Sequence, residues 1–365
     1  MQIPLVDVKA QYAPLVPRLR EAFDEVLESG QFVFGPNVAA FEEEAAAYLG
    51  TREAIGVANG TDAIELVLNA LEVESGDEVI CPAFTFYATA EAIARSGATP
   101  VFVDIDGETL NLDPVEVERK LGPKTKAIMP VHLFGRPAPL DALASLCRPL
   151  GLPLIEDAAQ AFGSPAIAGH GLASTFSFYP TKNLFGLGDG GLVAVNDPEL
   201  AERIRMLRFH GSKAKTTFEF IGRNSRLDEL QAAVLRIFLR ELDRWTELRR
   251  EAAERYRELG IGELCAAPDD EPGHVYHLFV CRSERRDEIR AALGDAGIGN
   301  GQYYLPPLHL QPALRYLGYA EGDLPVTEQV ARENFSVPLW AGIGAEQQER
   351  VVDVVRSAVG APAAA

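Results

Sequence analysis

Short apolar segments alternate with amphipathic segments between about residue 53 and residue 209. The apolar segments are four to six residues long, as in buried strands, and the segments between them have the length and periodicity of crossover helices. Such alternation predicts an α/β fold, with a mostly parallel sheet covered by helices on both faces and a ligand site at the carboxyl ends of its strands. The expected strands are 54–58, 78–81, 100–104, 126–131, 152–156 and 191–195, and the expected helices include 62–71, 88–96 and 140–150.

A long charged segment, residues 226–259, has apolar residues at helical spacing, and we expect it to connect two domains. The pattern after it is typical of a smaller α+β lobe. We therefore expect a large domain with an N-terminal helix over residues 1–245 and a small domain over residues 246–365. The last residues, 360–365, contain only Gly, Ala and Pro, and we expect them to be disordered. In the small lobe the expected strands are 275–281 and 335–338, and the expected helices are 285–296 and 347–359.

The charge of the chain limits its partners. Its 365 residues include 34 basic and 53 acidic side chains, a formal net charge of −19, which repels nucleic acid and anionic lipid. No apolar segment approaches the roughly 18 residues that a membrane span needs. At the N-terminus we find no basic region followed by a long apolar stretch, which a signal peptide would have. The four cysteines form no CxxC pair, which is typical of a reducing compartment. We expect a cytoplasmic protein that binds neither nucleic acid nor membrane, and no metal.

Two residues suggest a specific chemistry. Asp157 ends the apolar segment 152–157, and Lys182 follows 25 positions later on a turn rich in small residues. A lysine amine can form a Schiff base with an aldehyde cofactor, while a carboxylate at a strand tip can keep a pyridine nitrogen protonated, so that the ring accepts electrons. These requirements match pyridoxal phosphate (PLP). Taken singly, such a lysine is usually a solvated charge and such a carboxylate a helix cap.

A phosphate site is expected at Asn59-Gly60-Thr61-Asp62, which follows the first expected strand and opens a helix. Free backbone N–H groups and the positive end of the helix would hold the anion there. Ser177, five residues before Lys182, can add a hydroxyl group. An ordinary strand-to-helix turn with Thr61 as the helix cap explains the same tetrapeptide.

Other residues could complete a cofactor site. Phe86 lies in an aromatic stretch after the strand 78–81, where its ring could stack on a flat heterocycle, although aromatic residues after a strand are more often core. Gln160, three residues after Asp157, could reach a phenolic oxygen on the same ring or cap a turn. The glycine cluster 186–191 precedes a strand, so it does not match a dinucleotide-binding fingerprint, and we interpret it as backbone room beside the lysine.

The chain resembles the DegT-like nucleotide-sugar aminotransferases, which are fold type I PLP enzymes. The matching segments occur in the order of the family along nearly the whole chain. They are Gln31-Phe32-Val33-Phe34-Gly35-Pro36, Asn59-Gly60-Thr61-Asp62-Ala63, Gly76-Asp77-Glu78-Val79-Ile80, Pro130-Val131-His132-Leu133-Phe134-Gly135, Glu156-Asp157-Ala158-Ala159-Gln160, Phe176-Ser177-Phe178 with Lys182-Asn183, and Asn224-Ser225-Arg226-Leu227-Asp228.

The resemblance implies a mostly parallel seven-stranded sheet in the large domain and a role for each matching residue. It makes Lys182 the Schiff-base lysine and Asp157 the partner of the pyridine nitrogen. It stacks Phe86 on the ring and places Gly60, Thr61 and Ser177 on the phosphate. It also implies a homodimer with shared active sites, in which Asn224 reaches the phosphate of the neighbouring subunit's cofactor and Arg226 faces a substrate or donor carboxylate.

The substrate side departs from the family pattern. Where relatives often carry His-Tyr before a proline-containing segment, this chain has Tyr303 and Tyr304, followed by His309. Tyr304 and His309 are candidate substrate contacts by this resemblance, with Tyr303 in the place of the histidine. In the loop 210–222, Lys213 and Lys215 are the plausible cations for a diphosphate, although surface lysines are usually solvated.

The resemblance implies transfer of an amino group from L-glutamate to a keto-sugar linked to a nucleoside diphosphate, dTDP or UDP. Pyridoxamine phosphate would be the intermediate form of the cofactor, and Lys182 would move the proton. A keto-inositol or related cyclic ketone remains an alternative substrate. A PLP-dependent sugar dehydratase and a non-catalytic sensor are alternative functions. The related dehydratases carry histidine in place of the lysine, and a sensor would not need the lysine or Asp157, so both residues favour the transferase.

Overall fold

The computed structural model describes residues 2–360, and the expected disorder of 361–365 concerns residues outside this range. Nine strands are recorded in the described part, and all the strands expected from the sequence are among them within a few residues. One strand, β6, was not predicted. The strands are β1 (Glu53–Val57), β2 (Glu78–Pro82), β3 (Thr99–Val103), β4 (Thr125–Ile128), β5 (Ile155–Asp157), β6 (Ala173–Ser177), β7 (Gly191–Val195), β8 (Phe279–Arg282) and β9 (Asn334–Val337).

The large lobe contains a four-stranded sheet, β1-β7-β6-β5, and a three-stranded sheet, β3-β2-β4. Isolated parallel bridges, Ile128 to Leu154 and Val131 to Asp157, connect the edge of one sheet to the edge of the other. The expected single seven-stranded sheet is therefore present as two ladders linked by bridges. Pairing is parallel between β5 and β6 and between β2 and both of its neighbours, whereas β7 runs antiparallel to β1 and β6.

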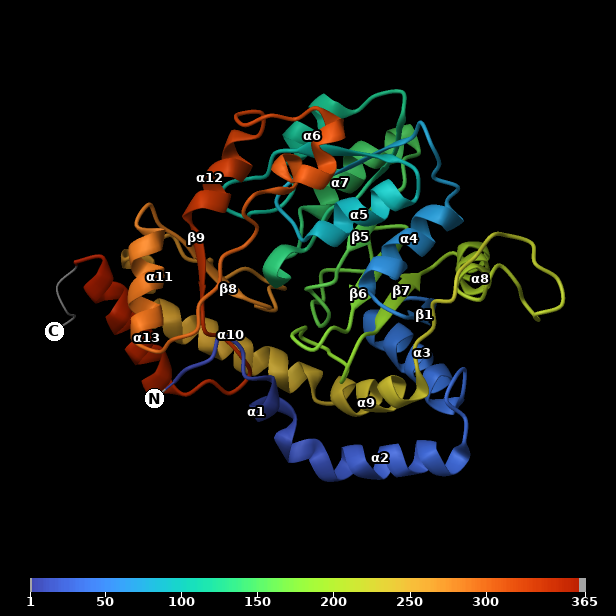
Figure 1. The fold of residues 1–365 in the computed structure, drawn as a ribbon, viewed down its shortest axis with the longest axis horizontal. Coiled ribbons are helices and arrows are strands. Elements are labelled where there is room, and N and C mark those ends of the chain that lie inside the picture. The colour runs from blue at the N-terminus through green and yellow to red at the C-terminus, as the bar shows by residue number, and fades with distance from the viewer. Residues whose placement is uncertain (1, 361–365) are drawn as a thin grey trace.

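Helices cover both faces of the four-stranded sheet, as the sequence predicted (Figure 1). Alternate residues of one strand serve the two cores: Val193 packs with α4, α5 and α8, while Leu192 packs with α2, α3 and α9. The helices are α1 (Val8–Tyr12), α2 (Val16–Ser29), α3 (Pro36–Leu49), α4 (Gly60–Ala70), α5 (Tyr87–Arg95), α6 (Pro114–Lys120), α7 (Leu140–Cys147), α8 (Pro198–Leu207), α9 (Glu229–Leu239), α10 (Leu242–Glu258), α11 (Arg286–Asp295), α12 (Pro325–Glu333) and α13 (Ala345–Ala358).

The expected connector is two helices, α9 and α10, which are separated at Arg240 and Glu241. Along α10 the packing changes, because Trp245 belongs to the core of the large lobe and Tyr256 to a core formed with α11, α13, β8 and β9. Figure 1 shows α10 running from the large lobe to these C-terminal elements. The division of the chain at residues 245 and 246 stays a prediction.

A segment of the C-terminal part also packs on the large lobe. The short helices η5 (Leu308–Leu310) and η6 (Pro312–Leu317) contribute Leu308 and Leu314 to the core beneath β2 and β3. Just beyond them, the Tyr319 hydroxyl donates to the carbonyl of Phe102 and accepts from its N–H, at 3.1 and 2.9 Å. Because β3 is an edge strand, Tyr319 satisfies main-chain groups that have no strand partner.

Replacing Tyr319 with phenylalanine is expected to lower the free energy of unfolding by about 1–2 kcal/mol, since two main-chain groups at the sheet edge lose their partner. Urea unfolding followed by circular dichroism measures the effect. Tyr316→Phe is the matched control, because Tyr316 lies in the same segment with a 66% exposed side chain. Equal unfolding midpoints for the two variants would show that the Tyr319 hydroxyl contributes no stability.

Candidate active site

A cavity of about 680 Å³ lies at the carboxyl end of β5, between the large lobe and C-terminal segments. This is the edge of the sheet at which the sequence predicted a ligand site. Residues from the chain start, Leu5 and Val6, close part of it. Eight of the predicted site residues line this one cavity, namely Gly60, Thr61, Phe86, Asp157, Gln160, Ser177, Lys182 and Tyr304.

Asp157 is held rigidly at the end of β5. Its main chain bonds on both sides to the neighbouring segment, with its N–H donating to the Pro130 carbonyl and its carbonyl accepting from the His132 N–H. Its carboxylate accepts from the Thr89 hydroxyl at 2.8 Å and from the Ala159 N–H at 3.2 Å. Burial raises the pKa of Asp157, while these hydrogen bonds and the charge of Lys182 act in the opposite direction. A cation in the cavity would therefore keep this carboxylate ionised.

Lys182 follows the end of β6 on a turn closed by the hydrogen bond from its N–H to the Tyr179 carbonyl. Burial lowers the pKa of its amine to about 8, against the opposing effect of Asp157. An amine with such a pKa is partly neutral near physiological pH, which is the form that attacks an aldehyde. Lys182 and Asp157, far apart in sequence, line the same cavity.

The first turn of α4 offers an anion site. The helix is capped by Asn59, whose side chain accepts from the Asp62 N–H at 2.8 Å, so the expected alternative with Thr61 as cap is wrong. Helix α4 starts so close to β6 that a Cβ at Gly60 would lie 2.8 Å from the Ser177 Cβ, so this position requires glycine. The Ser177 hydroxyl thus lies beside the free N–H groups of the first turn.

The glycine cluster 186–191 also lets other segments approach the backbone closely. A Cβ at Gly191 would lie 2.4 Å from the Asn59 carbonyl oxygen, and one at Gly186 would lie 2.8 Å from Oε1 of Gln231. The glycines therefore make room for the helix cap and for Gln231, and not for the lysine itself as the sequence suggested.

Aromatic and amide groups form another wall of the cavity. Phe86 directly precedes α5, and its side chain is 59% exposed although it is large and apolar. Gln160 accepts from the Phe134 N–H at 2.7 Å through Oε1 and donates to the Tyr304 hydroxyl at 3.1 Å through Nε2. One Nε2 hydrogen of Gln160 is left for a further acceptor.

Five predicted residues lie outside this cavity in the same chain. Asp62 and Asn224 line a separate open pocket, where Asp62 lies 3.7 Å from Arg223. The Arg226 guanidinium lies over the Phe34 ring, and Lys213 pairs with Glu202 on α8 at 2.5 Å. His309 is buried and bonded to Glu328 at 3.1 Å, which makes it part of the packing of the η5 segment.

Several cavity residues were not predicted. Thr85 and Thr89 are four positions apart, and their hydroxyl groups are 3.2 Å from each other beside Asp157. Their position next to Phe86 at the start of α5 was the signal available in the sequence. His277 also lines the cavity, although the segment 275–281 was interpreted only as an apolar strand. The remaining unpredicted residues include Leu5, Val6, Tyr179, Thr181 and Asp189, while Asn59 of the expected phosphate segment and Tyr303 also line the cavity.

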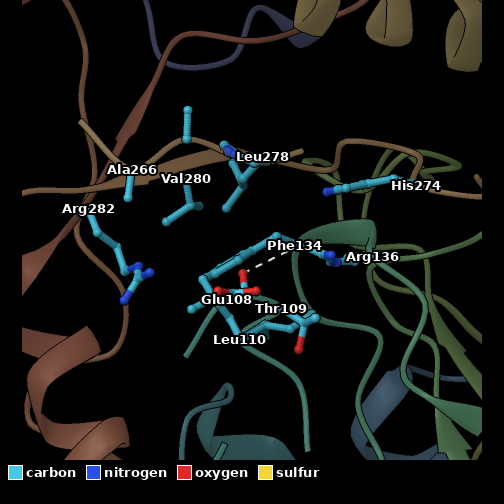
Figure 2. A pocket seen from close by; sticks show the side chains of 13 residues that line it. Glu108, Thr109, Leu110, Phe134, Arg136, Ala266, His274, Leu278, Val280 and Arg282 are labelled. Carbon is cyan, nitrogen blue, oxygen red and sulfur yellow. Dashed lines mark hydrogen bonds between the residues drawn. The ribbon is translucent and has the colours of Figure 1, made fainter. Parts of the chain in front are cut away.

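A second pocket, about 40 Å³ in volume, lies nearby between residues 108–136 and 266–282 (Figure 2). It is too small for a cofactor. Its Arg136 pairs with Glu271 and donates to the Glu108 carbonyl at 3.4 Å. Within residues 2–360, no group of three or more His, Cys, Asp or Glu side chains is arranged to hold a metal ion, and no helix is long and apolar enough to cross a membrane.

The donor set fits PLP. It combines a buried carboxylate that needs a cation, an amine of lowered pKa, a helix start with a hydroxyl for phosphate and an exposed aromatic ring. This fold and site define a PLP-dependent aminotransferase.

The chain belongs to the DegT/DnrJ/EryC1/StrS aminotransferase family, whose model matches residues 16–356. It is 47% identical to a Geobacillus stearothermophilus protein named pleiotropic regulatory protein, over 97% of this chain and 98% of the relative. It is 46% identical to a dTDP-3-amino-3,4,6-trideoxy-α-D-glucose transaminase of Streptomyces venezuelae, over 97% and 96%. The crystal structure of S. venezuelae DesV has a TM-score of 0.95 and 44% identity, covering 98% of each chain.

Replacing Thr89 with valine is expected to weaken PLP binding at least roughly 10-fold at neutral pH. Without this hydrogen bond the pKa of Asp157 rises further, so the carboxylate becomes protonated and loses its attraction for a cationic ring nitrogen. Titration with PLP, followed by visible absorbance, gives the dissociation constant. Thr89→Ser, which restores the hydroxyl, should bind as wild type, and unchanged affinity in the valine variant would exclude this role.

Proposed function

We propose that the protein transfers an amino group from L-glutamate to a keto-sugar linked to dTDP or UDP, with PLP as cofactor. The placement of Lys182 and Asp157 in one cavity, each affecting the pKa of the other, is the observation that carries the proposal. The names of relatives support the substrate class, since they include transaminases of both dTDP-linked and UDP-linked sugars. We also propose a cytoplasmic location, because all four cysteines are free thiols in the structure.

Each residue of the cavity would contact a different part of the cofactor. Asp157, fixed by Thr89, would hold the ring nitrogen, while Gly60, Thr61 and Ser177 would hold the phosphate and Phe86 the ring face. When bound, PLP would supply a ring that accepts electrons and an aldehyde carbon that carries the amino group between the two half-reactions. The Lys182 amine would carry the proton to and from the reacting carbon, for which a pKa of about 8 is suited.

The alternatives are less well supported. The lysine argues against a dehydratase of the kind in which histidine takes its place. A sensor without catalysis has one point in its favour, because the Geobacillus relative is named a regulatory protein. The chain nevertheless keeps Lys182 and Asp157 in one cavity, which ligand sensing alone does not require. A keto-inositol or another cyclic ketone remains the alternative substrate.

We further propose a homodimer in which Asn224 acts on the partner's cofactor. Asn224 lies outside the cavity of its own chain, which supports a role across an interface. It forms a bridge with Phe209, whose ring contacts Phe34 at 5.5 Å. Figure 1 shows the loop after α8 projecting from the large lobe. Large exposed apolar side chains near this surface, Phe32, Val33, Phe34, Phe218 and Ile221, support a partner of the same chain.

Lys182→Ala is expected to abolish both covalent capture of PLP and amino transfer, because no other amine would replace it. Borohydride reduction followed by peptide mapping locates the attached cofactor, and mass spectrometry with ¹⁵N-labelled glutamate and dTDP- and UDP-linked keto-sugars detects the amino-sugar product. Lys124→Ala, at an exposed loop position, serves as the control. A reducible adduct that persists in the Lys182 variant would refute the assignment.

Mixing two inactive variants tests the shared site. In a mixed dimer of Lys182→Ala and Asn224→Asp chains, one site has both an intact lysine and an intact asparagine if Asn224 acts across the interface. If subunits of the two variants exchange at random, about half of the dimers are mixed and one of the two sites in each is intact. About one quarter of the wild-type activity should then return. No recovery, although mixed dimers form, would place the Asn224 function within its own chain.

A further inference from the structure

His277 is a buried side chain of the cavity that the proposed chemistry does not use. Its side chain is only 5% exposed, and it lines the cavity together with Lys182. Its Nδ1 atom is buried and has no hydrogen-bond partner among the described residues. His132 differs, because its ring bonds to both the Glu156 carboxylate and the Ala138 N–H. An unpaired buried nitrogen is costly unless a ligand or a second state of the site supplies its partner.

The backbone before His277 is held in a conformation that favours glycine. Tyr276 has a φ of +44°, which is unusual for a bulky residue. The Tyr276 N–H donates to Nδ1 of His274 at 3.0 Å, and the two rings stack with centroids 3.9 Å apart. Arg257 donates to the Tyr276 hydroxyl at 3.0 Å. These contacts stabilise a strained turn whose effect is to direct the next residue, His277, into the cavity.

A buried cation supports the same turn from behind. Arg249 of α10 is fully buried, and its Nη1 donates to the carbonyl oxygens of Tyr276 and His277, at 3.2 and 3.4 Å. No carboxylate pairs with it within the described chain, and burial lowers its pKa to about 10. Burying a guanidinium with only carbonyl groups as partners is costly. The structural effect of Arg249 is that it fixes the turn through these two carbonyl groups.

The turn is also tied directly to the lysine loop. Asn183, next to Lys182, donates to the Val275 carbonyl at 2.8 Å, and the Val275 N–H donates to the Gly135 carbonyl at 2.9 Å. The Asn183 side chain therefore bonds the segment that carries Lys182 to the segment that carries His277.

We propose, resting on the PLP function proposed above, that His277 is a positioning residue whose unpaired ring nitrogen accepts a hydrogen bond from the Lys182 amine when that amine is not bonded to cofactor. The interaction orients the free amine, which otherwise rotates about four side-chain bonds. It places the Lys182 nitrogen for return of the proton and for recapture of the cofactor.

The charges around His277 keep its ring in the form that the role requires. Burial lowers the pKa of His277 well below its usual value, and the charges of Lys182 and Arg249 lower it further. A neutral imidazole has one acceptor nitrogen, whereas imidazolium has none and would repel the ammonium group. The other ionisable groups that line the cavity are Asp157, Tyr179, Asp189, Tyr303 and Tyr304.

The test is the pH dependence of PLP capture by the full-length protein freed of cofactor, because capture requires the neutral Lys182 amine. In wild type the rate should rise with a midpoint near pH 8, the pKa of Lys182. In His277→Leu the midpoint should fall by roughly one pH unit, since loss of the acceptor destabilises the ammonium form. His277→Gln, whose amide oxygen can accept, should restore the wild-type midpoint. Equal midpoints in all three proteins, or equal shifts in both variants, would overturn the proposal.

A second measurement uses only the wild-type protein, so it does not depend on the folding of a variant. Nitrogen-15 NMR of the histidine rings in wild type, with six histidines to assign, should show His277 neutral from about pH 6.5, the ordinary pKa of histidine, to pH 9, because burial lowers the pKa of His277. Titration of His277 within that range would overturn the proposal. Failure of wild type to capture PLP at Lys182 would instead refute the proposed function, so the two failures are distinguishable.

Discussion

The burial of two opposite charges, Lys182 and Asp157, in one cavity is the constraint on which the site depends. Each group is unfavourable to bury as an ion, as the lowered pKa of the amine and the raised pKa of the carboxyl show. Each also favours the charged form of the other. The fold fixes Asp157 through main-chain bonds to Pro130 and His132, and it fixes the backbone of Lys182 through a bond to the Tyr179 carbonyl. Reactivity here is a consequence of rigid burial.

The sequence predicted the strands that are continuous apolar runs, because burial on both faces leaves that pattern. It missed β6, where Ser174 and Thr175 are fully buried. The Thr175 hydroxyl donates to the Glu156 carbonyl at 3.2 Å, so a polar residue satisfies its hydrogen bond inside the sheet. No local pattern separates such a strand from a loop. The antiparallel direction of β7 was likewise hidden, since strand direction depends on connections between distant segments.

The cavity was predictable where function imposes a motif and unpredictable where only the fold brings groups together. Residue type and position predicted Asp157, Lys182 and the start of α4, the resemblance implied the same residues, and all three features line one cavity. Thr89 and His277 reach the cavity only through the fold, because Thr89 bonds to Asp157, 68 positions away, and His277 comes from the C-terminal part. Asp62 shows the converse, because a residue inside a matching motif points its carboxylate to a different surface and to Arg223.

The large lobe and the C-terminal part contribute different residues to the cavity. The charged pair comes from the sheet of the large lobe, whereas Tyr303, Tyr304 and His277 reach the cavity from the C-terminal part. Tyr303 is fixed through its N–H, which donates to Asn334 at 2.9 Å, and its ring contacts Phe134. A different side chain at Tyr303 would change the shape and the hydrogen-bonding groups of this wall, while the main-chain bonds that fix Asp157 would stay the same. One wall of such a cavity can therefore vary while the pair of Asp157 and Lys182 is retained.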